Sequence, residues 1–245
     1  MSATMTASPL LLGHRGARGV RSATENTFSS FDHALRAGCD GFEFDVRLSA
    51  DQRAVITHDS RCHGLSVASS TYSQLLRTTK PRANSKNAAS REGNQLVCLE
   101  DVLVRYKNRA LLDIELKVPG LETIVLGALR QSSISREYVI SSFLPDILWE
   151  IKARSPSITG MICDRKTQLG RWPKLPAEYL ILEQKLLTRL LIDELHAARR
   201  KVFVWTVNTP ARMRRFADWG VDGIISDNPD LLVQTLRPGP AKVQN

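Results

Sequence analysis

Gly41-Phe42-Glu43-Phe44-Asp45-Val46 is the clearest strand in the amino-acid sequence, because aromatic and acidic residues alternate along it. Successive side chains of a strand point to opposite faces. Phe42 and Phe44 therefore share one face, which a hydrophobic core would cover, and Glu43 and Asp45 project together from the other. The segment predicts a strand that separates a core from an acidic, polar space.

Strand-like segments recur along the chain and alternate with helical patterns. Strands are expected at residues 10–13, 41–46, 54–57, 110–116, 138–141, 158–162, 179–182, 202–206 and 221–226. Helices are expected at residues 25–38, 99–107, 145–154, 188–199, 210–219 and 229–236, and another follows Pro119, a good first-turn residue. Such alternation forms parallel βαβ units, and about eight of them close into a barrel. We therefore predict an α/β fold, a TIM (β/α)8 barrel, with residues 1–245 as one domain.

The expected strands are one more than a closed barrel of eight needs. Residues 41–46 and 54–57 are too close in sequence for a crossover helix, because parallel neighbours need a dozen or more residues between them. We expect this pair to be joined as a hairpin, or one of its members to lie outside the barrel.

The composition is that of a globular protein. The chain has 245 residues, of which 42% are hydrophobic and 24% charged, and a single α/β barrel commonly has about 250 residues. No window reaches the ~18 apolar residues of a membrane span, and residues 1–12 lack the basic start of a signal peptide. We therefore expect a cytoplasmic protein without a transmembrane segment. Its oligomeric state stays open.

The four cysteines are widely spaced, with no Cys-x-x-Cys pair. This spacing argues against a zinc ribbon and against a disulfide framework. We expect Cys39, Cys62, Cys98 and Cys163 to be small buried hydrophobic residues.

The net charge of +9 is concentrated in two regions. Residues 61–93 carry six basic side chains and one acidic, and residues 185–215 carry eight basic and two acidic. Solvated helix faces and a loop would explain both regions, and a nucleic acid or a lipid surface is the alternative. The runs Arg199-Arg200-Lys201 and Arg212-Met213-Arg214-Arg215 contain no aromatic residue, so we expect no specific nucleic-acid partner.

Residues 60–94 interrupt the regular alternation. They are rich in Ser, Thr, Arg and Asn, and show a short helical pattern only at Tyr72, Leu75 and Leu76. A loop of this length within a compact domain is usually functional or disordered. We expect an insertion with one short helix here, and a disordered tail at residues 238–245.

Acidic side chains cluster at the expected carboxyl ends of two strands, where barrel active sites form. Glu43 and Asp45 share one face of the second strand, and Asp113 and Glu115 share one face of a later strand. Like charges placed together in a barrel mouth are costly unless a cation joins them. Because carboxylate oxygens suit hard cations, the pattern predicts a site for one divalent ion, Ca²⁺ or Mg²⁺.

Two histidines and two basic side chains follow strands at the same end of the barrel. His14 and Arg15 follow the first strand, His58 ends the third, and Lys117 shares the face of Glu115. With an ordinary pKa of about 6.5, one histidine can accept a proton while the other donates one. Arg15 and Lys117 could neutralise a phosphate. A divalent metal, two cations and an acid–base pair are what phosphodiester cleavage requires.

The same residues belong to a longer resemblance. Nine motifs, in order, resemble the signature of the glycerophosphodiester phosphodiesterase family: Gly13-His14-Arg15-Gly16, Glu25-Asn26-Thr27, Phe42-Glu43-Phe44-Asp45-Val46, His58-Asp59, Cys98-Leu99-Glu100-Asp101-Val102-Leu103, Ile114-Glu115-Leu116-Lys117, Ser141-Ser142-Phe143, Val204-Trp205-Thr206-Val207-Asn208 and Trp219-Gly220-Val221-Asp222-Gly223-Ile224-Ile225-Ser226-Asp227. They cover about residues 10–235, and the length is similar to that of the compact cytosolic bacterial members.

The resemblance implies hydrolysis of small-molecule glycerophosphodiesters, such as glycerophosphocholine or glycerophosphoethanolamine, to glycerol 3-phosphate and an alcohol. It implies a barrel of the phosphodiesterase type with a small insertion after the His-Asp motif, which fits residues 60–94. It also implies acid–base roles for His14 and His58, metal binding by Glu43, Asp45 and Glu115, and phosphate binding by Arg15 and Lys117. Trp205 matches an aromatic residue that packs against the substrate at the pocket wall, and an ordinary core position is the alternative.

Three further polar residues stand near these motifs. Asp113 shares the face of Glu115 but matches no metal ligand of the family, so we expect it to support the site by hydrogen bonding. We expect Glu25 and Asn26 either to begin a helix, with Glu25 in the favourable first turn, or to contact the site from its edge.

The chain departs from the family pattern in two places. Thr24 stands where the family usually has proline, and Ser60-Arg61-Cys62-His63-Gly64-Leu65 replaces a Leu-x-Arg-Thr-Thr stretch. The second departure alters the insertion, which lines the alcohol end of the substrate in the family, so the head group stays open.

Two rival functions are consistent with parts of the sequence. A lysophospholipase D-like enzyme would hydrolyse lysophospholipids at the same site and would need an apolar groove. A non-enzymatic anion-binding module would use the two basic regions, but it would have no need of the paired histidines and carboxylates.

Overall fold

Eight parallel strands form a closed barrel in the computed structural model, which describes residues 8–79, 95–134 and 137–238. They are β1 (Leu10–Gly13), β2 (Gly41–Leu48), β6 (Leu111–Leu116), β7 (Tyr138–Ser142), β8 (Thr159–Cys163), β9 (Tyr179–Glu183), β10 (Lys201–Trp205) and β11 (Gly223–Ser226). Each strand pairs with the next around the ring, and β1 closes it by pairing with both β11 and β2. The predicted TIM (β/α)8 barrel is confirmed.

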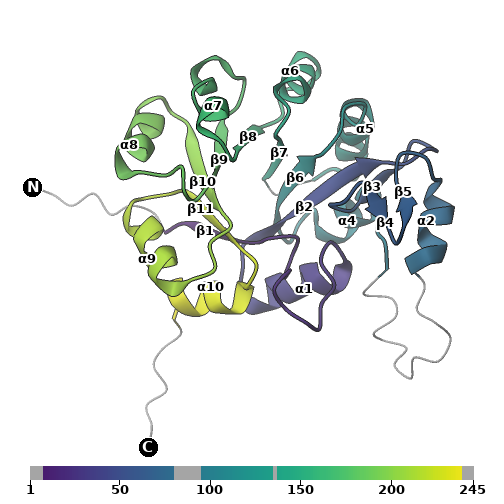
Figure 1. Cartoon of the computed structure of the whole chain (residues 1–245), viewed down its shortest axis with the longest axis horizontal. Helices are drawn as coiled ribbons and strands as arrows, with labels where there is room; N and C mark the ends of the chain where they lie inside the picture. The colour runs from purple at the N-terminus through teal and green to yellow at the C-terminus, as the bar shows by residue number, and fades with distance from the viewer. Residues whose placement is uncertain (1–7, 80–94, 135–136, 239–245) are drawn as a thin grey trace, which may run out of the picture.

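Helices follow the barrel strands and surround them (Figure 1). They are α1 (Phe28–Ala37), α4 (Leu99–Tyr106), α5 (Glu122–Ser132), α6 (Pro145–Arg154), α7 (Lys166–Leu169) with the 3₁₀ turn η1 (Trp172–Lys174), α8 (Arg189–Ala197), α9 (Pro210–Asp218) and α10 (Pro229–Leu236). Among the described residues, none of the helices has the length and apolar character that crossing a membrane would need.

The ninth expected strand lies outside the barrel. Strand β3 (Ala54–Ile56) runs antiparallel to the end of β2, with Val46 opposite Ile56 and Leu48 opposite Ala54. The short connection therefore forms a hairpin, as the spacing required. Because β2 extends past its last pairing with β6 at Val46, the hairpin projects beyond the barrel mouth.

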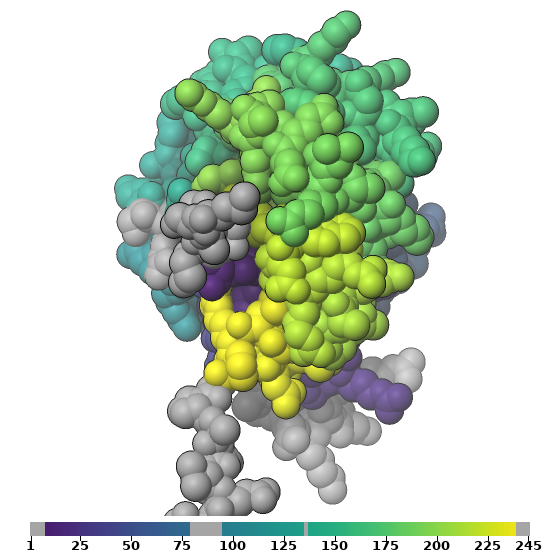
Figure 2. All heavy atoms as spheres, turned by 90° about the vertical axis from the view of Figure 1, so that its left-hand side faces the viewer, coloured from purple at the N-terminus to yellow at the C-terminus, as the bar shows by residue number. Residues whose placement is uncertain are grey.

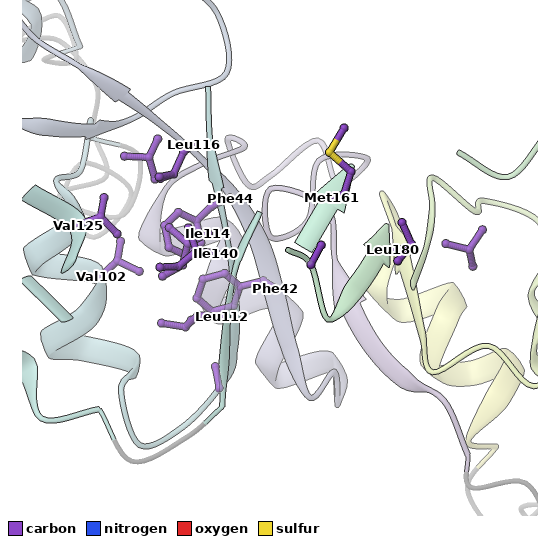
Figure 3. Close-up of a cluster of buried hydrophobic side chains, with 14 of the residues drawn as sticks. Phe42, Phe44, Val102, Leu112, Ile114, Leu116, Val125, Ile140, Met161 and Leu180 are labelled. Atoms are coloured by element: carbon purple, nitrogen blue, oxygen red, sulfur yellow. The ribbon is translucent and has the colours of Figure 1, made fainter. Parts of the chain in front are cut away.

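Two hydrophobic cores hold the barrel. The larger core lies between the strands and the surrounding helices, where Phe42 and Phe44 of β2 pack near Ile114 and near Val102 and Val125 of the helices (Figure 3). The smaller core fills the barrel interior and includes Leu12, Leu111, Val139, Ile162, Tyr179, Ile181, Phe203 and Ile225. The predicted alternation of β2 is thus confirmed, because its phenylalanines face the helices.

Several expected element boundaries are wrong. Helix α1 begins at Phe28 rather than residue 25, because the Thr27 side chain caps it by accepting from the Ser30 N–H. Glu25 therefore does not lie in its first turn. Helix α5 begins at Glu122, so Pro119 belongs to the preceding loop. The other differences are one or two residues at element ends.

The described part of the insertion is more ordered than expected. It contains the two-stranded hairpin β4 (Arg61–Cys62) and β5 (Leu65–Ser66) and the helix α2 (Tyr72–Thr79), which lies where the short helical pattern was expected. Residues 80–94 of the insertion and 239–245 of the expected tail lie outside the described residues. All four cysteines are free thiols and buried, as expected.

The second basic region lies on the outer face of the barrel. Figure 2 shows the face formed by α8, α9 and α10. Its exposed basic side chains include Lys185, Arg189, Arg199, Lys201, Arg212, Arg214 and Arg215. The interpretation of this region as a solvated helix face fits the structure.

Candidate active site

The turn after β1 brings two predicted site residues to the barrel mouth. A Cβ on Gly13 would lie 1.8 Å from the Gly16 carbonyl oxygen, and Gly16 itself has a φ of +81°, so the chain can close this tightly only with glycine. The Ser30 hydroxyl donates to the Arg15 carbonyl at 2.7 Å. The turn therefore fixes the backbone of His14 and Arg15.

Three buried carboxylates meet at the mouth of the barrel. Asp45 of β2 lies opposite Glu115 of β6 in the strand register, and Glu43 lies one pair deeper, beside Asp113. One oxygen from each of Glu43, Asp45 and Glu115 lies within 4.8 Å of the others. The strand alternation thus brings the three predicted metal ligands together.

The electrostatics of these carboxylates differ. Burial and the neighbouring Asp45 and Glu115 raise the pKa of Glu43 well above its ordinary value. Burial and Asp45 raise the pKa of Glu115 to about 7, although Lys117 opposes the shift. Burial also acts to raise the pKa of Asp45, but Lys117 and Arg15 lower it further, so its net shift is downward. Asp45 is therefore the carboxylate that carries the negative charge, and both Lys117 and Arg15 interact with it.

The donor set fits a hard divalent cation. All three ligand groups are carboxylates, and the Oε1 atom of Glu43 is buried without a hydrogen-bond partner among the described residues. Buried oxygens of this kind normally have a partner. A bound divalent ion would supply one and would allow all three groups to ionise.

Arg15 and Lys117 flank the carboxylates from opposite sides. The Nζ atom of Lys117 donates to Glu115 at 2.5 Å and lies 3.3 Å from Asp45. The Nε atom of Arg15 lies 3.2 Å from Asp45, and its Nη1 donates to Glu25 at 2.9 Å. Both cations are within reach of an anion that binds in the cleft.

Asn26 and Glu25 support this arrangement from the loop before α1. The Asn26 side-chain amide donates to Asp45 at 2.9 Å, and its carbonyl oxygen accepts from the Asp45 N–H at 3.3 Å. Glu25 holds Arg15 and also accepts from Arg18 at 3.0 Å. Of the two alternatives considered for these residues, contact with the site is the one observed.

Asp113 lies at the base of the cleft and does not contribute to the three-carboxylate group. It accepts a hydrogen bond from the Ser141 hydroxyl at 2.6 Å, and burial raises its pKa to about 7 despite that bond. The expected supporting position of Asp113 agrees with this contact.

Each of the two histidines is hydrogen-bonded to an aspartate through Nδ1. His14 pairs with Asp227 at 2.7 Å, and its Nε2 lies 3.8 Å from Glu43. His58 pairs with Asp59 at 2.8 Å. These bonds orient each ring so that Nε2 is the nitrogen available for proton transfer.

The other half of the cleft is apolar. Trp205 at the end of β10 donates through Nε1 to the Ile181 carbonyl at 3.2 Å and packs edge-on against Phe143, with the ring centroids 5.7 Å apart. The cleft measures about 440 Å³ and is also lined by Ile162, Ile181 and Ile225. Trp205 therefore lies at the cleft wall and contacts the interior core as well.

The sequence analysis gave no site role to Asp227, Asn208 and Phe143, although each stands in one of the nine motifs. The Asn208 amide donates to Asp227 at 2.6 Å, and its carbonyl oxygen accepts from the Asp227 N–H at 3.0 Å. These residues lie at or just after the carboxyl ends of barrel strands. The position of Asp227 and Asn208 after the strand ends could have indicated a role in the site, because polar residues there face the site in this fold. For the apolar Phe143 the position alone gives a weaker indication.

Comparison with known proteins gives a consistent result. A family model described as the glycerophosphoryl diester phosphodiesterase family matches residues 14–231. A putative glycerophosphodiester phosphodiesterase of Bacillus subtilis is 30% identical over 237 residues, which cover 91% of this chain and 96% of the relative. A lysophospholipase D of Homo sapiens is 23% identical over 268 residues, covering 90% of this chain and 84% of that protein.

A solved structure shares the architecture. A phosphodiesterase of Oleispira antarctica, in complex with the product sn-glycerol-3-phosphate, superposes with a TM-score of 0.78 and is 25% identical. The match covers 93% of this chain and 96% of the other. The barrel and its connections are therefore shared over nearly the whole length of both chains.

Proposed function

Because the chain belongs to the glycerophosphoryl diester phosphodiesterase family and is a phosphoric diester hydrolase, we propose that it releases glycerol 3-phosphate and an alcohol from glycerophosphodiesters such as glycerophosphocholine. The observation that carries the proposal is the grouping of three buried carboxylates, two cations and two histidines around one cleft. The cytoplasmic location and the single-domain organisation of residues 1–245 remain predictions.

Arg15 and Lys117 bind the phosphate of the substrate in this proposal. Each contacts Asp45, which holds its charged group at the edge of the cleft. A guanidinium and an ammonium placed beforehand stabilise the charge that grows on the phosphate oxygens, without moving during the reaction. A divalent metal held by Glu43, Asp45 and Glu115, either Ca²⁺ or Mg²⁺, supplies further charge stabilisation when bound.

The two histidines divide the proton transfers. His14 is held by Asp227, which is only partly exposed, so we assign His14 the removal of a proton from the nucleophile, either water or the glycerol 2-hydroxyl. His58 is more exposed and borders the outer end of the cleft, so we assign it the donation of a proton to the departing alcohol oxygen. With water as the nucleophile, one P–O bond forms while the P–O bond to the alcohol breaks, which gives glycerol 3-phosphate directly. With the glycerol 2-hydroxyl as the nucleophile, the same exchange of bonds gives a 1,2-cyclic phosphate, and a water molecule must then open it to glycerol 3-phosphate. In both routes the alcohol leaves on the side of His58.

The first experiment measures glycerol 3-phosphate released from glycerophosphocholine with Ca²⁺, with Mg²⁺ and with a chelator. We expect metal-dependent release, and we expect Glu43→Gln to reduce it by about 10²-fold. Glu150→Gln is the matched control, because Glu150 lies exposed on α6 and pairs with Arg154. Release that survives both the chelator and Glu43→Gln would contradict the metal-dependent mechanism.

The second candidate is lysophospholipase D-like hydrolysis at the same site. The apolar half of the cleft, formed by Trp205, Phe143 and three isoleucines, is the observation that favours it, and a lysophospholipase D is among the relatives. Turnover of lysophosphatidylcholine is therefore measured beside that of glycerophosphocholine. Faster turnover of the lysophospholipid would make this candidate the main activity.

A further inference from the structure

We propose that a second groove beside the cleft binds the departing alcohol and favours alcohols that carry a phosphate of their own. The groove measures about 1000 Å³ and is lined by residues from the end of β2, the hairpin β4–β5 and the loop after β6. The inference rests on the proposed function, because it concerns the other end of the same substrate.

The described lining of the groove combines basic and polar side chains with apolar ones such as Leu48 and Val118. Arg47 and Arg61 contribute to it together with Ser60, Ser66 and Gln52, and none of the described lining residues is acidic. Neither arginine forms an ion pair within the part of the chain that the structure describes, whereas Arg15 and Arg18 both do. No acidic side chain lines the described part of the groove, although Arg47 also interacts with the carboxylates of Asp45, Asp59 and Glu115 outside it.

The two arginines are held by different elements. Arg61 lies in β4 opposite Ser66, and its Nη2 donates to the Gly64 carbonyl at 2.5 Å within the same hairpin. Arg47 lies near the end of β2, and its Nε donates to the His58 carbonyl at 2.7 Å. Guanidinium groups fixed in this way can present their remaining N–H donors to one phosphate.

Two segments of chain lead from the lining of the cleft to the lining of the groove. Lys117 lines the cleft, and the next two residues, Val118 and Pro119, line the groove. His58 lines the cleft, and Ser60 and Arg61 line the groove. Arg61 is thus three residues along the chain from His58, on whose side the alcohol leaves in the proposed reaction.

A third groove also reaches His58, but its charge is less suitable. It measures about 750 Å³, and Arg61 lines it as well, but here together with the carboxylates of Glu25 and Asp59. A second phosphate placed there would face two like charges. The arginine-lined groove is consequently the site that the electrostatics favour for an anionic alcohol, and Arg61 gives part of the first basic region a role.

The test compares glycerophosphoinositol with glycerophosphoinositol 4-phosphate, which differ only in the second phosphate on the alcohol. We expect the phosphorylated diester to have the higher kcat/KM. Arg61→Gln should lower the ratio of the two kcat/KM values by about tenfold, which is the size expected for one charge-assisted contact. Arg61→Glu should lower the ratio further.

Arg77→Gln is the control, since Arg77 is an exposed arginine of the same insertion that does not line the groove. This substitution should leave the ratio of the two kcat/KM values unchanged.

The outcomes separate this inference from the proposed function. Hydrolysis of neither diester, nor of glycerophosphocholine, would contradict the proposed function itself. Hydrolysis of both inositol diesters with a ratio near one, or a ratio that Arg61→Gln and Arg77→Gln change equally, would contradict only the arginine-lined subsite. A ratio that falls in the order wild type, Arg61→Gln, Arg61→Glu would support it.

Discussion

The two histidines of the cleft have aspartate partners that differ in exposure. The side chain of Asp227 is 17% exposed, whereas that of Asp59 is 79% exposed. Burial acts to raise the pKa of Asp227, but its hydrogen bonds with His14 and Asn208 lower it further, so the carboxylate stays ionised. A buried carboxylate orients and stabilises a protonated histidine far better than an exposed one, because solvent screens the exposed pair.

We therefore expect Asp227→Asn to lower kcat by about 10²-fold and Asp59→Asn to lower it by less than about tenfold. The measurement is steady-state hydrolysis of glycerophosphocholine by both variants over a range of pH. KM should change little in either variant, since neither aspartate is in contact with Arg15 or Lys117. Equal losses in the two variants would show that burial of the partner is not what matters.

At the scale of single residues, the sequence predicts side chains that share a strand face and misses those that meet through loops. Alternation within two strands groups Glu43, Asp45, Asp113 and Glu115, and the family resemblance separates Asp113 from the other three. Asp227 contacts His14 across 213 positions of sequence, and only closure of the barrel brings β11 beside β1. No local pattern contains that contact.

The turn between β1 and α1 is the element on which the site depends most directly. Gly16 has a φ of +81°, and an added Cβ would lie 2.4 Å from the Ser30 hydroxyl and 2.6 Å from the Ser30 carbonyl carbon. Gly64, in the hairpin β4–β5, has a φ of +89° but has nothing within 4 Å of the same position. The two glycines share a backbone conformation and differ in available space.

Substitution by alanine should separate these two effects. We expect Gly64→Ala to lower the free energy of unfolding by about 1 kcal/mol and Gly16→Ala to lower it by about 3 kcal/mol, since a clash adds to the strain. Gly16→Ala should also lower kcat through displacement of Arg15. Urea unfolding at neutral pH gives both free energies. Similar losses at the two positions would mean that the turn relaxes around the added methyl group.

The carboxylate of Glu178 joins β8 to the segment before β9 on the side opposite the cleft. It accepts from the Thr159 N–H at 2.8 Å and pairs with Lys152. Burial raises the pKa of Glu178, but these contacts lower it further, so its net shift is downward. A carboxylate with a lowered folded-state pKa stabilises the protein above its unfolded-state pKa, about 4.3, and loses that contribution as the pH falls through the folded-state value.

Glu178→Gln should therefore be less stable than wild type at pH 7, and the difference should shrink as the pH falls below about 4. Unfolding by urea at a series of pH values gives the difference directly, with Glu150→Gln as the exposed control. A difference that is independent of pH would show that the hydrogen bonds, and not the charge, carry the contribution of Glu178.

At the scale of elements, the sequence predicts the strands and helices that have a regular hydrophobic period. The barrel strands and most helices follow from alternation and from apolar spacing. The hairpin β4–β5, the turn η1 and the start of α1 were missed or misplaced, because tertiary contacts fix them. Thr27 rather than Glu25 caps α1, for example, because the loop before it is bent toward Asp45 by Asn26.

The whole barrel is divided into two halves of different polarity. The mouth beside β1, β2 and β6 carries the charged groups, whereas β8, β9 and β11 contribute Ile162, Ile181 and Ile225. The apolar half excludes water from the charged half, which strengthens attraction and repulsion there alike. Without a cation, the three carboxylates are consequently a source of instability for the entire fold.

This division predicts how the stability of the molecule responds to metal. Ca²⁺ or Mg²⁺ at about 100 times its dissociation constant stabilises the folded protein by about 2.7 kcal/mol. For a chain of this size, this stabilisation raises Tm by roughly 5–10 °C. Glu43→Gln replaces a buried carboxyl group whose pKa is raised by burial, Asp45 and Glu115, and whose Oε1 has no partner among the described residues. The Glu43→Gln substitution should raise Tm in the presence of a chelator by about 2–4 °C and abolish most of the rise of Tm with metal.

Calorimetry of wild type, Glu43→Gln and Glu150→Gln, each with and without metal, measures both effects. If the Tm of Glu43→Gln rose with metal as much as that of wild type, the ion would bind elsewhere. If Glu43→Gln lowered Tm with chelator present, the three carboxylates would not repel one another in the folded barrel.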